Sequence, residues 1–159
     1  ISPAVAGRLA AHPAIVGMKD SSGDVQHLTA VAYATENADF GVYTGTDALL
    51  SAALQSGAIG TIAASVNLVP TLAMAIYDAV RAGDPAAADG SQRRLFDIVT
   101  ACRRGGIPVG WKAALQLAGV CDATLAAPAI GLSKADHDAL RADLTRLDVD
   151  GTLGIAGRS

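Results

Sequence analysis

Lys19 is the residue whose type and position best fit covalent chemistry. It ends the apolar run 15–18, which we predict to be a buried strand, and it lies where a strand-to-helix loop begins. Functional groups in parallel α/β folds gather at the carboxyl ends of strands. Apolar neighbours would partly desolvate the ammonium group and favour the neutral amine, which can attack a carbonyl carbon and form a Schiff base. An ion pair with Asp20 or Asp47 at the rim of the sheet is the structural alternative.

A second candidate segment, Gly45–Asp47, follows the next strand-like run at 40–44. A glycine at this place lets a substrate approach the backbone, and the N–H groups at a helix start can bind a carboxylate. The alternative is a plain turn and helix cap. The third strand end, 62–67, carries no charge, so only backbone groups or Ser65 and Asn67 could act there.

Other chemistry has little support in the sequence. His12, His27 and His137 match no metal-ligand spacing. Ser21 and Ser22 lack the G-x-S-x-G context of a nucleophilic serine, and no glycine pattern matches a P-loop or a dinucleotide fingerprint. We therefore expect neither a metal nor a nucleotide or flavin cofactor.

Alternating strands and helices must position Lys19 and Gly45. The apolar runs predict strands over 15–19, 40–44 and 59–63, and helices over 3–11, 25–35, 48–55, 70–81, 85–104, 108–117 and 134–147. The expected helix caps are Ser2, Asp24, Thr46 with Asp47, Asp84 and Ser133, and Gly57 is expected to end the third helix. This alternation, with a repeat of roughly twenty residues, predicts parallel βαβ units in a barrel or an open doubly wound sheet.

The strands stop after Gly83, which divides the chain into three predicted regions. Residues 1–83 form part of a sheet or barrel, residues 84–147 form a helical extension, and residues 148–159 form a flexible tail. Within the extension we place Trp111 in the core and Lys112 on a helix surface.

Composition bounds the class of protein. Of 159 residues, 51% are hydrophobic and 17% charged, with a formal net charge of -3, which excludes a disordered chain. The weakly acidic balance argues against a nucleic-acid or anionic-membrane partner. Cys102 and Cys121 match no disulfide or metal pattern and fit buried thiols in a reducing compartment. Because the chain starts at Ile1 without Met, we expect it to be part of a longer polypeptide.

The thirty residues between Asp47 and Asp78 carry no charge. A membrane span needs about 20 continuous apolar residues. Polar and helix-breaking residues interrupt this stretch at Gln55, Gly57, Gly60, Asn67 and Pro70. We therefore predict short, buried strands and helices rather than a membrane span.

At this point the motifs resemble a known family. Residues 15–24 read Ile-Val-Gly-Met-Lys-Asp-Ser-Ser-Gly-Asp and resemble the Schiff-base lysine signature of the dihydrodipicolinate synthase / N-acetylneuraminate lyase family. Further segments are similar to the next strand end, the eighth strand with the helix after it, and the C-terminal helices of that family: 43–47, 57–62 with Asn67 and Pro70, 107–119 and 128–132. The resemblance covers nearly all of residues 1–147.

The resemblance implies an α/β fold, a (β/α)8 TIM barrel of which this chain holds strands six to eight and a C-terminal helical extension. It implies that Lys19 forms an imine with pyruvate or another 2-oxo acid. Gly45, Thr46 and the backbone carbonyl of Ile62 would line the substrate site. No metal or organic cofactor is implied, and family members are cytoplasmic homotetramers built as dimers of dimers.

Departures from the family pattern affect the choice of reaction. The family's tyrosine acid/base and its Thr/Ser pair belong to earlier strands, and neither Tyr33 nor Tyr43 has that motif context. Residues 102–106 replace an asparagine- and proline-rich stretch, and the turn at 20–24 is similar to members that cleave 4-hydroxy-2-oxo acids. These features favour a class I lyase or aldolase over 4-hydroxy-tetrahydrodipicolinate synthase, which condenses pyruvate with aspartate semialdehyde. An alternative of another class is a catalytically silent half-barrel that serves only as an assembly module, and the fragment alone is expected to be inactive.

Overall fold

The computed structural model describes residues 1–148, 151 and 153. The chain divides into two compact units, which are described separately. The first comprises residues 1–63 and 73–92, and the second comprises residues 64–72 and those from 93 onwards. The predicted site residues Lys19, Gly45, Thr46 and Ile62 all belong to the first unit.

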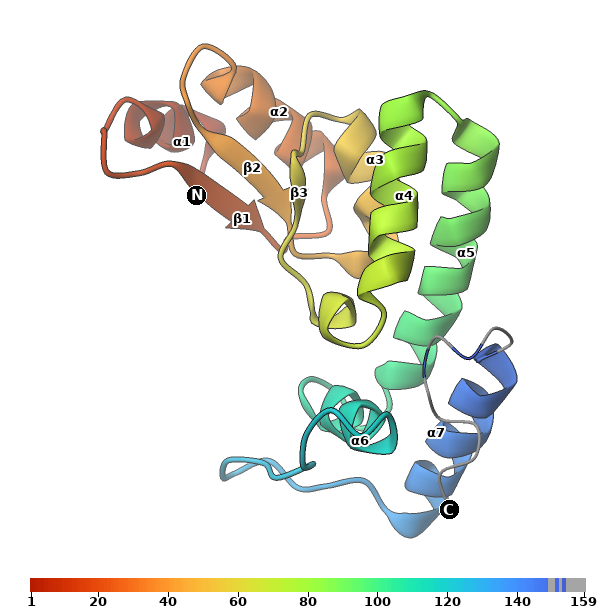
Figure 1. The fold of residues 1–159 in the computed structure, drawn as a ribbon. Helices are drawn as coiled ribbons and strands as arrows, with labels where there is room; N and C mark the ends of the chain where they lie inside the picture. The colour runs from red at the N-terminus through yellow and green to blue at the C-terminus, as the bar shows by residue number, and fades with distance from the viewer. Residues whose placement is uncertain (149–150, 152, 154–159) are drawn as a thin grey trace. The chain divides into compact units, whose positions relative to one another are not determined.

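A three-stranded parallel sheet forms the centre of the first unit (Figure 1). Its strands are β1 (Gly17–Asp20), β2 (Gly41–Thr44) and β3 (Gly60–Thr61), in that spatial order. The predicted parallel βαβ arrangement is therefore confirmed. The third strand is shorter than the predicted 59–63. After one more backbone bond to β2, from Ile62 N to Thr44 O, the chain turns into the 3-10 helix η2 (Ala64–Asn67).

Two helices, α1 (Pro3–Ala10) and α2 (Val25–Thr35), pack against each other on one side of this sheet (Figure 1). Both predicted N-caps are confirmed: Ser2 Oγ accepts a hydrogen bond from Val5 N, and Asp24 Oδ1 accepts one from His27 N. Their apolar faces join the sheet in one core, which contains Ala6, Leu28, Val31, Val42, Ala53 and Ala58. Burial of these side chains from water is the main force that holds the helices on the sheet.

The helix predicted to start at residue 48 begins differently. A 3-10 turn, η1 (Asp47–Leu49), precedes α3 (Leu50–Gln55), and Thr46 makes no side-chain cap. The predicted Thr46 cap is wrong, because a distant residue bonds the start of the helix instead: Gln92 Oε1 accepts a hydrogen bond from Ser51 N at 2.8 Å, and Gln92 Nε2 donates to Asp47 O. Gly57 ends the segment as predicted, with φ +103°, where a side chain would be strained.

Two long helices, α4 (Pro70–Ala82) and α5 (Pro85–Cys102), follow the sheet. Gly83, with φ +70°, separates them, and Asp84 Oδ1 accepts a hydrogen bond from Ala87 N as the predicted cap of α5. No described helix combines the length and apolar character needed to cross a membrane.

The second unit contains α6 (Val109–Leu117) and α7 (Lys134–Leu147). Trp111 is buried, as predicted, and Ser133 caps α7 by accepting a hydrogen bond from Asp136 N. Arg104 Nη2 and Asp143 Oδ2 form an ion pair at 2.5 Å. The helices predicted over 108–117 and 134–147 and the Ser133 cap are therefore confirmed.

The prediction of two buried thiols is wrong in part. Cys102 is buried as expected, but Cys121 is exposed because it lies in the irregular segment after α6 rather than on a packed helix face. Most of the predicted flexible tail lies outside the described residues. Of its described members, Asp148 and Leu153 are buried, and Leu153 N donates a hydrogen bond to Asp148 Oδ1 at 2.7 Å.

Candidate functional site

The predicted site residues lie at the carboxyl ends of three neighbouring strands. Lys19 is the third residue of β1, Gly45 and Thr46 directly follow β2, and Ile62 directly follows β3. Because the strands are parallel, these ends meet at one edge of the sheet. The structure thus brings together the positions singled out from the sequence.

The stem of Lys19 reaches across to the loop after β2. A Cβ atom added at Gly45 would lie 2.8 Å from Lys19 Cδ and would overlap Ser21 Oγ. Gly45 therefore leaves the space that these two side chains occupy. A glycine at this position is required by close approach, since its φ is not in the left-handed region.

Lys19 itself is exposed, so the expectation of a partly desolvated ammonium group is wrong for the described structure. The helices cover the opposite face of the sheet, where Val42 and Asp20 are buried. On the face of Lys19, Ile59 and Ile62 are more than half exposed. Nothing in the described part of the chain covers this face closely enough to remove water from the amine.

The alternative role for Lys19, an ion pair with Asp20 or Asp47, is also absent among the described residues. Asp20 is buried, and its carboxylate accepts hydrogen bonds from the backbone N and the Oγ of Ser22, at 2.8 and 3.0 Å. Ser22 Oγ accepts a further bond from Asp24 N. These bonds fix the turn after β1 and hold the Asp20 carboxylate on the local backbone.

The backbone donors expected to bind a carboxylate are already engaged. Gly45 N donates to Asp20 O at 2.6 Å, and Thr46 N donates to Thr44 Oγ1 at 3.1 Å. These bonds tie the end of β2 to β1 and to its own last residue. The Thr46 hydroxyl makes no hydrogen bond to a described residue.

Two residues of this face, Ser21 and Tyr43, were considered in the sequence and set aside. Tyr43 is the register partner of Lys19 on β1 and of Gly60 on β3. Ser21 follows Lys19 by two residues and lies against it at Gly45. The signal that could have found them is the two-residue period of a strand, which puts residues 19 and 21, and residues 43 and 45, on the same side.

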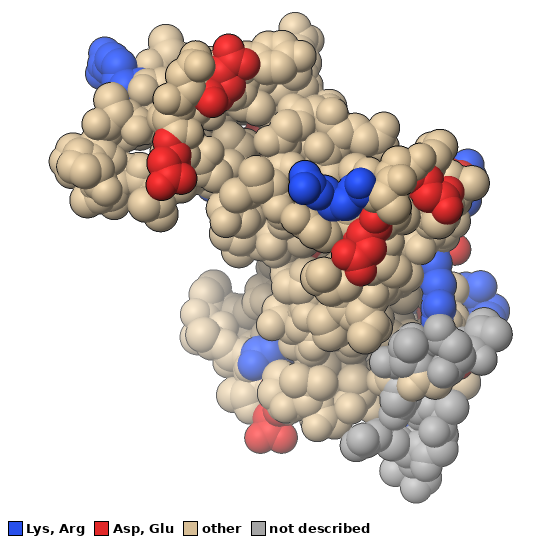
Figure 2. All heavy atoms as spheres, turned by 45° about the horizontal axis from the view of Figure 1, so that its top comes forward, with Lys and Arg blue, Asp and Glu red and all other residues tan. Residues whose placement is uncertain are grey.

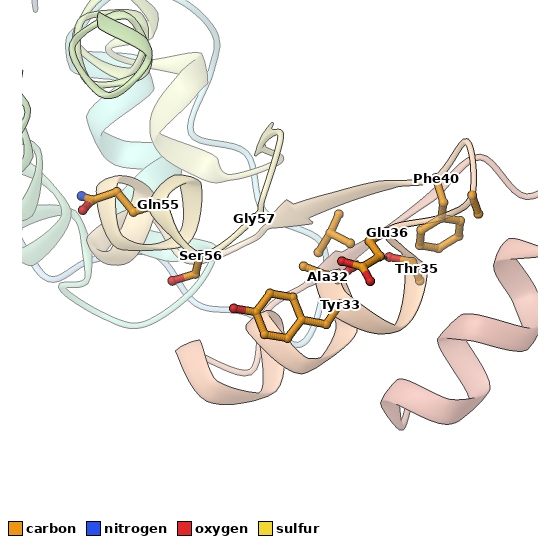
Figure 3. Close-up of a pocket in the computed structure, with 10 residues that line it drawn as sticks. Ala32, Tyr33, Thr35, Glu36, Phe40, Gln55, Ser56 and Gly57 are labelled. Carbon is orange, nitrogen blue, oxygen red and sulfur yellow. Dashed lines mark hydrogen bonds between the residues drawn. The ribbon is translucent and has the colours of Figure 1, made fainter. Parts of the chain in front are cut away.

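A hollow in the surface of the first unit lies elsewhere. It has a volume of about 370 Å³ and lies beside the amino end of β2, where α2 and α3 end. Figure 3 shows Tyr33 of α2 and Glu36, which directly follows α2, at this hollow, with Gln55 and Ser56 at the end of α3. None of the predicted site residues lines it.

Charge and metal-ligating groups do not mark a further site. Charged side chains are scattered over a surface that is otherwise largely uncharged in the view of Figure 2. No group of three or more His, Cys, Asp or Glu side chains in the described part of the chain could hold a metal ion.

A parallel sheet with a lysine amine at its carboxyl edge places the chain among α/β proteins whose functional groups follow the strands. Comparison with known proteins is more specific. The model of the dihydrodipicolinate synthetase family matches residues 1–147, and the chain belongs to that family.

Three proteins illustrate the relationship. A 4-hydroxy-tetrahydrodipicolinate synthase of Methanoculleus marisnigri is 31% identical over 141 residues, which are 89% of this chain and 48% of that protein. An uncharacterised DapA-like lyase of Halobacterium salinarum is 36% identical over 84% of this chain and 43% of its own length. The crystal structure of YagE, a member of the dihydrodipicolinic acid synthase family from E. coli K12 in complex with pyruvate, matches with a TM-score of 0.83 and 29% identity, over 93% of this chain and 51% of that one.

The chain therefore spans about half the length of the relatives it matches. This coverage and the three-stranded parallel sheet support the predicted fold as part of a barrel. The resemblance to this lyase family, inferred from residues 15–24, is confirmed.

Proposed function

We propose that the polypeptide carrying this chain is a class I lyase of the aldolase type, in which Lys19 forms an imine with pyruvate or a related 2-oxo acid. The observation that carries the proposal is the position of Lys19 at the carboxyl end of β1, with its stem against Gly45. Membership of the dihydrodipicolinate synthetase family supports it. The pyruvate bound in the YagE complex supports the choice of acid.

The reaction starts when the neutral Lys19 amine attacks C2 of the 2-oxo acid. The carbinolamine loses water and leaves an imine, which as its iminium form accepts electrons from a neighbouring bond. Loss of a proton from C3 gives an enamine that can add to an aldehyde, and the reverse sequence breaks the bond between C3 and C4. Hydrolysis of the final imine returns the free amine and releases the 2-oxo acid.

Neighbouring groups on the carboxyl edge would orient the acid. Gly45 provides space beside the lysine stem, and the Thr46 hydroxyl is the donor we assign to the carboxylate. The Ile62 carbonyl would line the opposite side, after β3. Enclosure by the rest of a barrel would supply the desolvation that favours the neutral amine. We therefore assign activity to the whole polypeptide and expect residues 1–159 alone to be inactive.

The preferred reaction is cleavage or formation of a 4-hydroxy-2-oxo acid. Its structural support is Ser21, whose hydroxyl lies beside the Lys19 stem and Gly45 and can bind a hydroxyl group of the substrate. The second candidate is condensation of pyruvate with aspartate semialdehyde, as in 4-hydroxy-tetrahydrodipicolinate synthase. The names of several relatives favour this candidate. A direct comparison of pyruvate release from 4-hydroxy-2-oxo acids with aspartate-semialdehyde condensation decides between the two reactions.

The alternative of another class, a silent assembly module, rests on the edge of β1. That edge pairs with no other strand in the described part of the chain, and Val16 beside it is 72% exposed. An unpaired edge of this kind favours pairing with further strands. We also propose that the whole polypeptide assembles as a cytoplasmic homotetramer, a dimer of dimers, which sedimentation would test.

Imine trapping tests the main proposal. The whole polypeptide, including any sequence that precedes Ile1 in its reading frame, is incubated with pyruvate and borohydride and then digested for mass spectrometry. We expect the peptide containing Lys19 to gain the mass of one pyruvic acid less one oxygen atom. Lys19→Arg should abolish the adduct, and the matched variant Lys112→Arg should retain it. An unmodified wild-type protein, or an adduct that persists in Lys19→Arg, would show that the proposal is wrong.

A further inference from the structure

The face of the sheet that carries Lys19 has a second ordered feature, the ring of Tyr43. Tyr43 occupies the central strand β2, level with Lys19 on one side and Gly60 on the other. Residues paired in register point to the same face of a parallel sheet. Tyr43 and Lys19 therefore belong to one surface, about 5 Å apart along the direction of the backbone hydrogen bonds.

Glycines beneath the ring show where it lies. A Cβ atom added at Gly41 would be 3.0 Å from Tyr43 Cε2, and one added at Gly60 would be 3.4 Å from Cδ1 and Cε1 of the same ring. Ile59 shares this space, because its Cδ1 would be 2.6 Å from the added atom at Gly41. The ring and the isoleucine thus lie over the sheet on the amino-terminal side of Lys19.

The Lys19 side chain extends in the opposite direction, toward the carboxyl end of the sheet. Its Cδ lies against Gly45, which follows the carboxyl end of β2, whereas Gly41 begins the same strand. The amine and the ring of Tyr43 therefore diverge along the strand direction. A 2-oxo acid bound to the amine would lie above the ring, with open space toward the carboxyl edge and a hydrophobic surface below.

We propose that Tyr43, together with Ile59, forms the floor of the 2-oxo acid site and selects pyruvate over acids with a larger group on C3. This inference rests on the proposed imine chemistry of Lys19. When the enamine carbon C3 adds to an aldehyde that arrives from the open edge, its remaining substituents bend away from the new bond and toward the floor. Pyruvate places only hydrogens there, whereas 2-oxobutyrate places a methyl group against the Tyr43 ring.

The effect on selectivity follows from the size of that methyl group. Excluding one additional methyl or methylene group from a packed apolar site changes relative rates by about 10- to 200-fold. The Tyr43 hydroxyl makes no hydrogen bond to any described residue. The ring, and not the hydroxyl, is therefore the part of Tyr43 that we assign to selection.

Competition between two acids tests the inference. The whole polypeptide is given equal concentrations of pyruvate and 2-oxobutyrate with borohydride, and the two adducts on the Lys19 peptide are compared. A parallel assay measures addition of each acid's enamine to an aldehyde acceptor. Wild type and the matched control Tyr43→Phe should show the same preference for pyruvate in both assays. Tyr43→Ala should shift the preference in the addition assay toward 2-oxobutyrate by about tenfold or more.

The outcomes separate the two proposals. Suppose that wild type and Tyr43→Ala both trap pyruvate and show the same preference for it over 2-oxobutyrate. The proposed role of Tyr43 is then wrong, and the imine chemistry of Lys19 stands. If wild type traps neither acid, the imine chemistry fails and the floor fails with it. If Tyr43→Ala does not fold, Ile59→Ala replaces it, with a smaller shift expected in the same direction, and an unchanged preference there contradicts the floor.

Discussion

The two faces of the small parallel sheet differ in how completely other side chains bury them. On one face, Val42 packs with Leu28 and Val31 of α2 and with Ala6 of α1, and all four side chains are almost completely buried. On the other face, Lys19, Ile59 and Ile62 are exposed, and glycines at 41, 45 and 60 leave room for the side chains that lie over them.

One face of this short-stranded sheet thus stabilises the fold, and the other carries the proposed chemistry. The helix-covered face excludes water and supplies the burial that orders the sheet. The Lys19 face contributes little burial, and its glycines leave space for a lysine stem and an aromatic ring, as the proposed 2-oxo acid site requires. Substitutions on the helix-covered face should therefore lower mainly the stability, whereas substitutions on the Lys19 face should lower mainly the rate of imine formation.

The largest expected effect is on the covered face. Leu28→Ala would leave a cavity among side chains that are almost fully buried, and it should lower the free energy of unfolding by about 2–5 kcal/mol. On the other side, Ile62→Ala and Lys19→Ala should change it by less than about 0.5 kcal/mol, because both residues are exposed. Urea unfolding of the whole polypeptide measures all three variants. Equal losses on both faces would contradict the comparison.

The next effect concerns chemistry on the exposed face. Gly45→Ala would place a methyl group on Ser21 Oγ and 2.8 Å from Lys19 Cδ, so the lysine stem must move. A displacement of about 1 Å at a reacting group can cost about 100-fold in rate, and we expect a loss of this order in the rate of pyruvate trapping.

A second substitution checks the cause of that loss. Ser21→Ala removes the hydroxyl that the new methyl group overlaps, so Gly45→Ala combined with Ser21→Ala should recover part of the trapping rate. No recovery, with both variants folded, would mean that Gly45 does not act through the space it leaves for Lys19 and Ser21.

A smaller effect is expected at the start of α3, where the side chain of Gln92 of α5 forms hydrogen bonds with the backbone. Gln92→Ala removes the bonds to Ser51 N and Asp47 O and should lower the free energy of unfolding by about 1–2 kcal/mol. Gln26→Ala is the matched control, because Gln26 is an exposed residue of α2. Imine trapping should be almost unchanged in both variants. A similar loss of stability in the Gln26 variant would show that the Gln92 bonds contribute nothing.

The smallest effect lies on α7, remote in sequence from both faces. A hydrogen bond from Lys134 lowers the pKa of Asp138 below its ordinary value of 3.8. A lowered pKa in the folded state stabilises the protein above the unfolded-state pKa, and this contribution is lost as the pH falls through the folded-state pKa. Because Asp138 is exposed, Asp138→Asn should differ from wild type only marginally at neutral pH. Thermal unfolding at neutral and strongly acidic pH measures the difference, which should vanish in acid.

Local signals in the sequence predicted most of the fold. The caps Ser2, Asp24, Asp84 and Ser133 each act as predicted, because a cap bonds a backbone group only two or three residues away. The cap of α3 could not be predicted, because its side chain, Gln92, lies 41 residues from Ser51 in the sequence. Contacts over such distances depend on packing, which has no local pattern.

The candidate site likewise has features that local signals predicted and features that depend on packing. The position of Lys19 after an apolar run, and of Gly45 after the next, predicted that the two would meet, and the register of β1 and β2 brings them together. The solvent exposure of Lys19 was predicted wrongly, since the strand was treated as buried on both faces and the described chain covers one. Tyr43 was set aside because it lacks a family motif, whereas its relevance comes from its register with Lys19.

The sequence by itself determined the order of strands and helices, the position of the Lys19 amine at a strand end, and the family. These follow from apolar periodicity, caps and motifs, which act over a few neighbouring residues. Only the tertiary structure decided which side chains share the face of Lys19, that Gly45 leaves room for its stem, and that Tyr43 lies over Gly41 and Gly60. The physical reason is that strand register and close packing are set by the whole unit and not by any one segment.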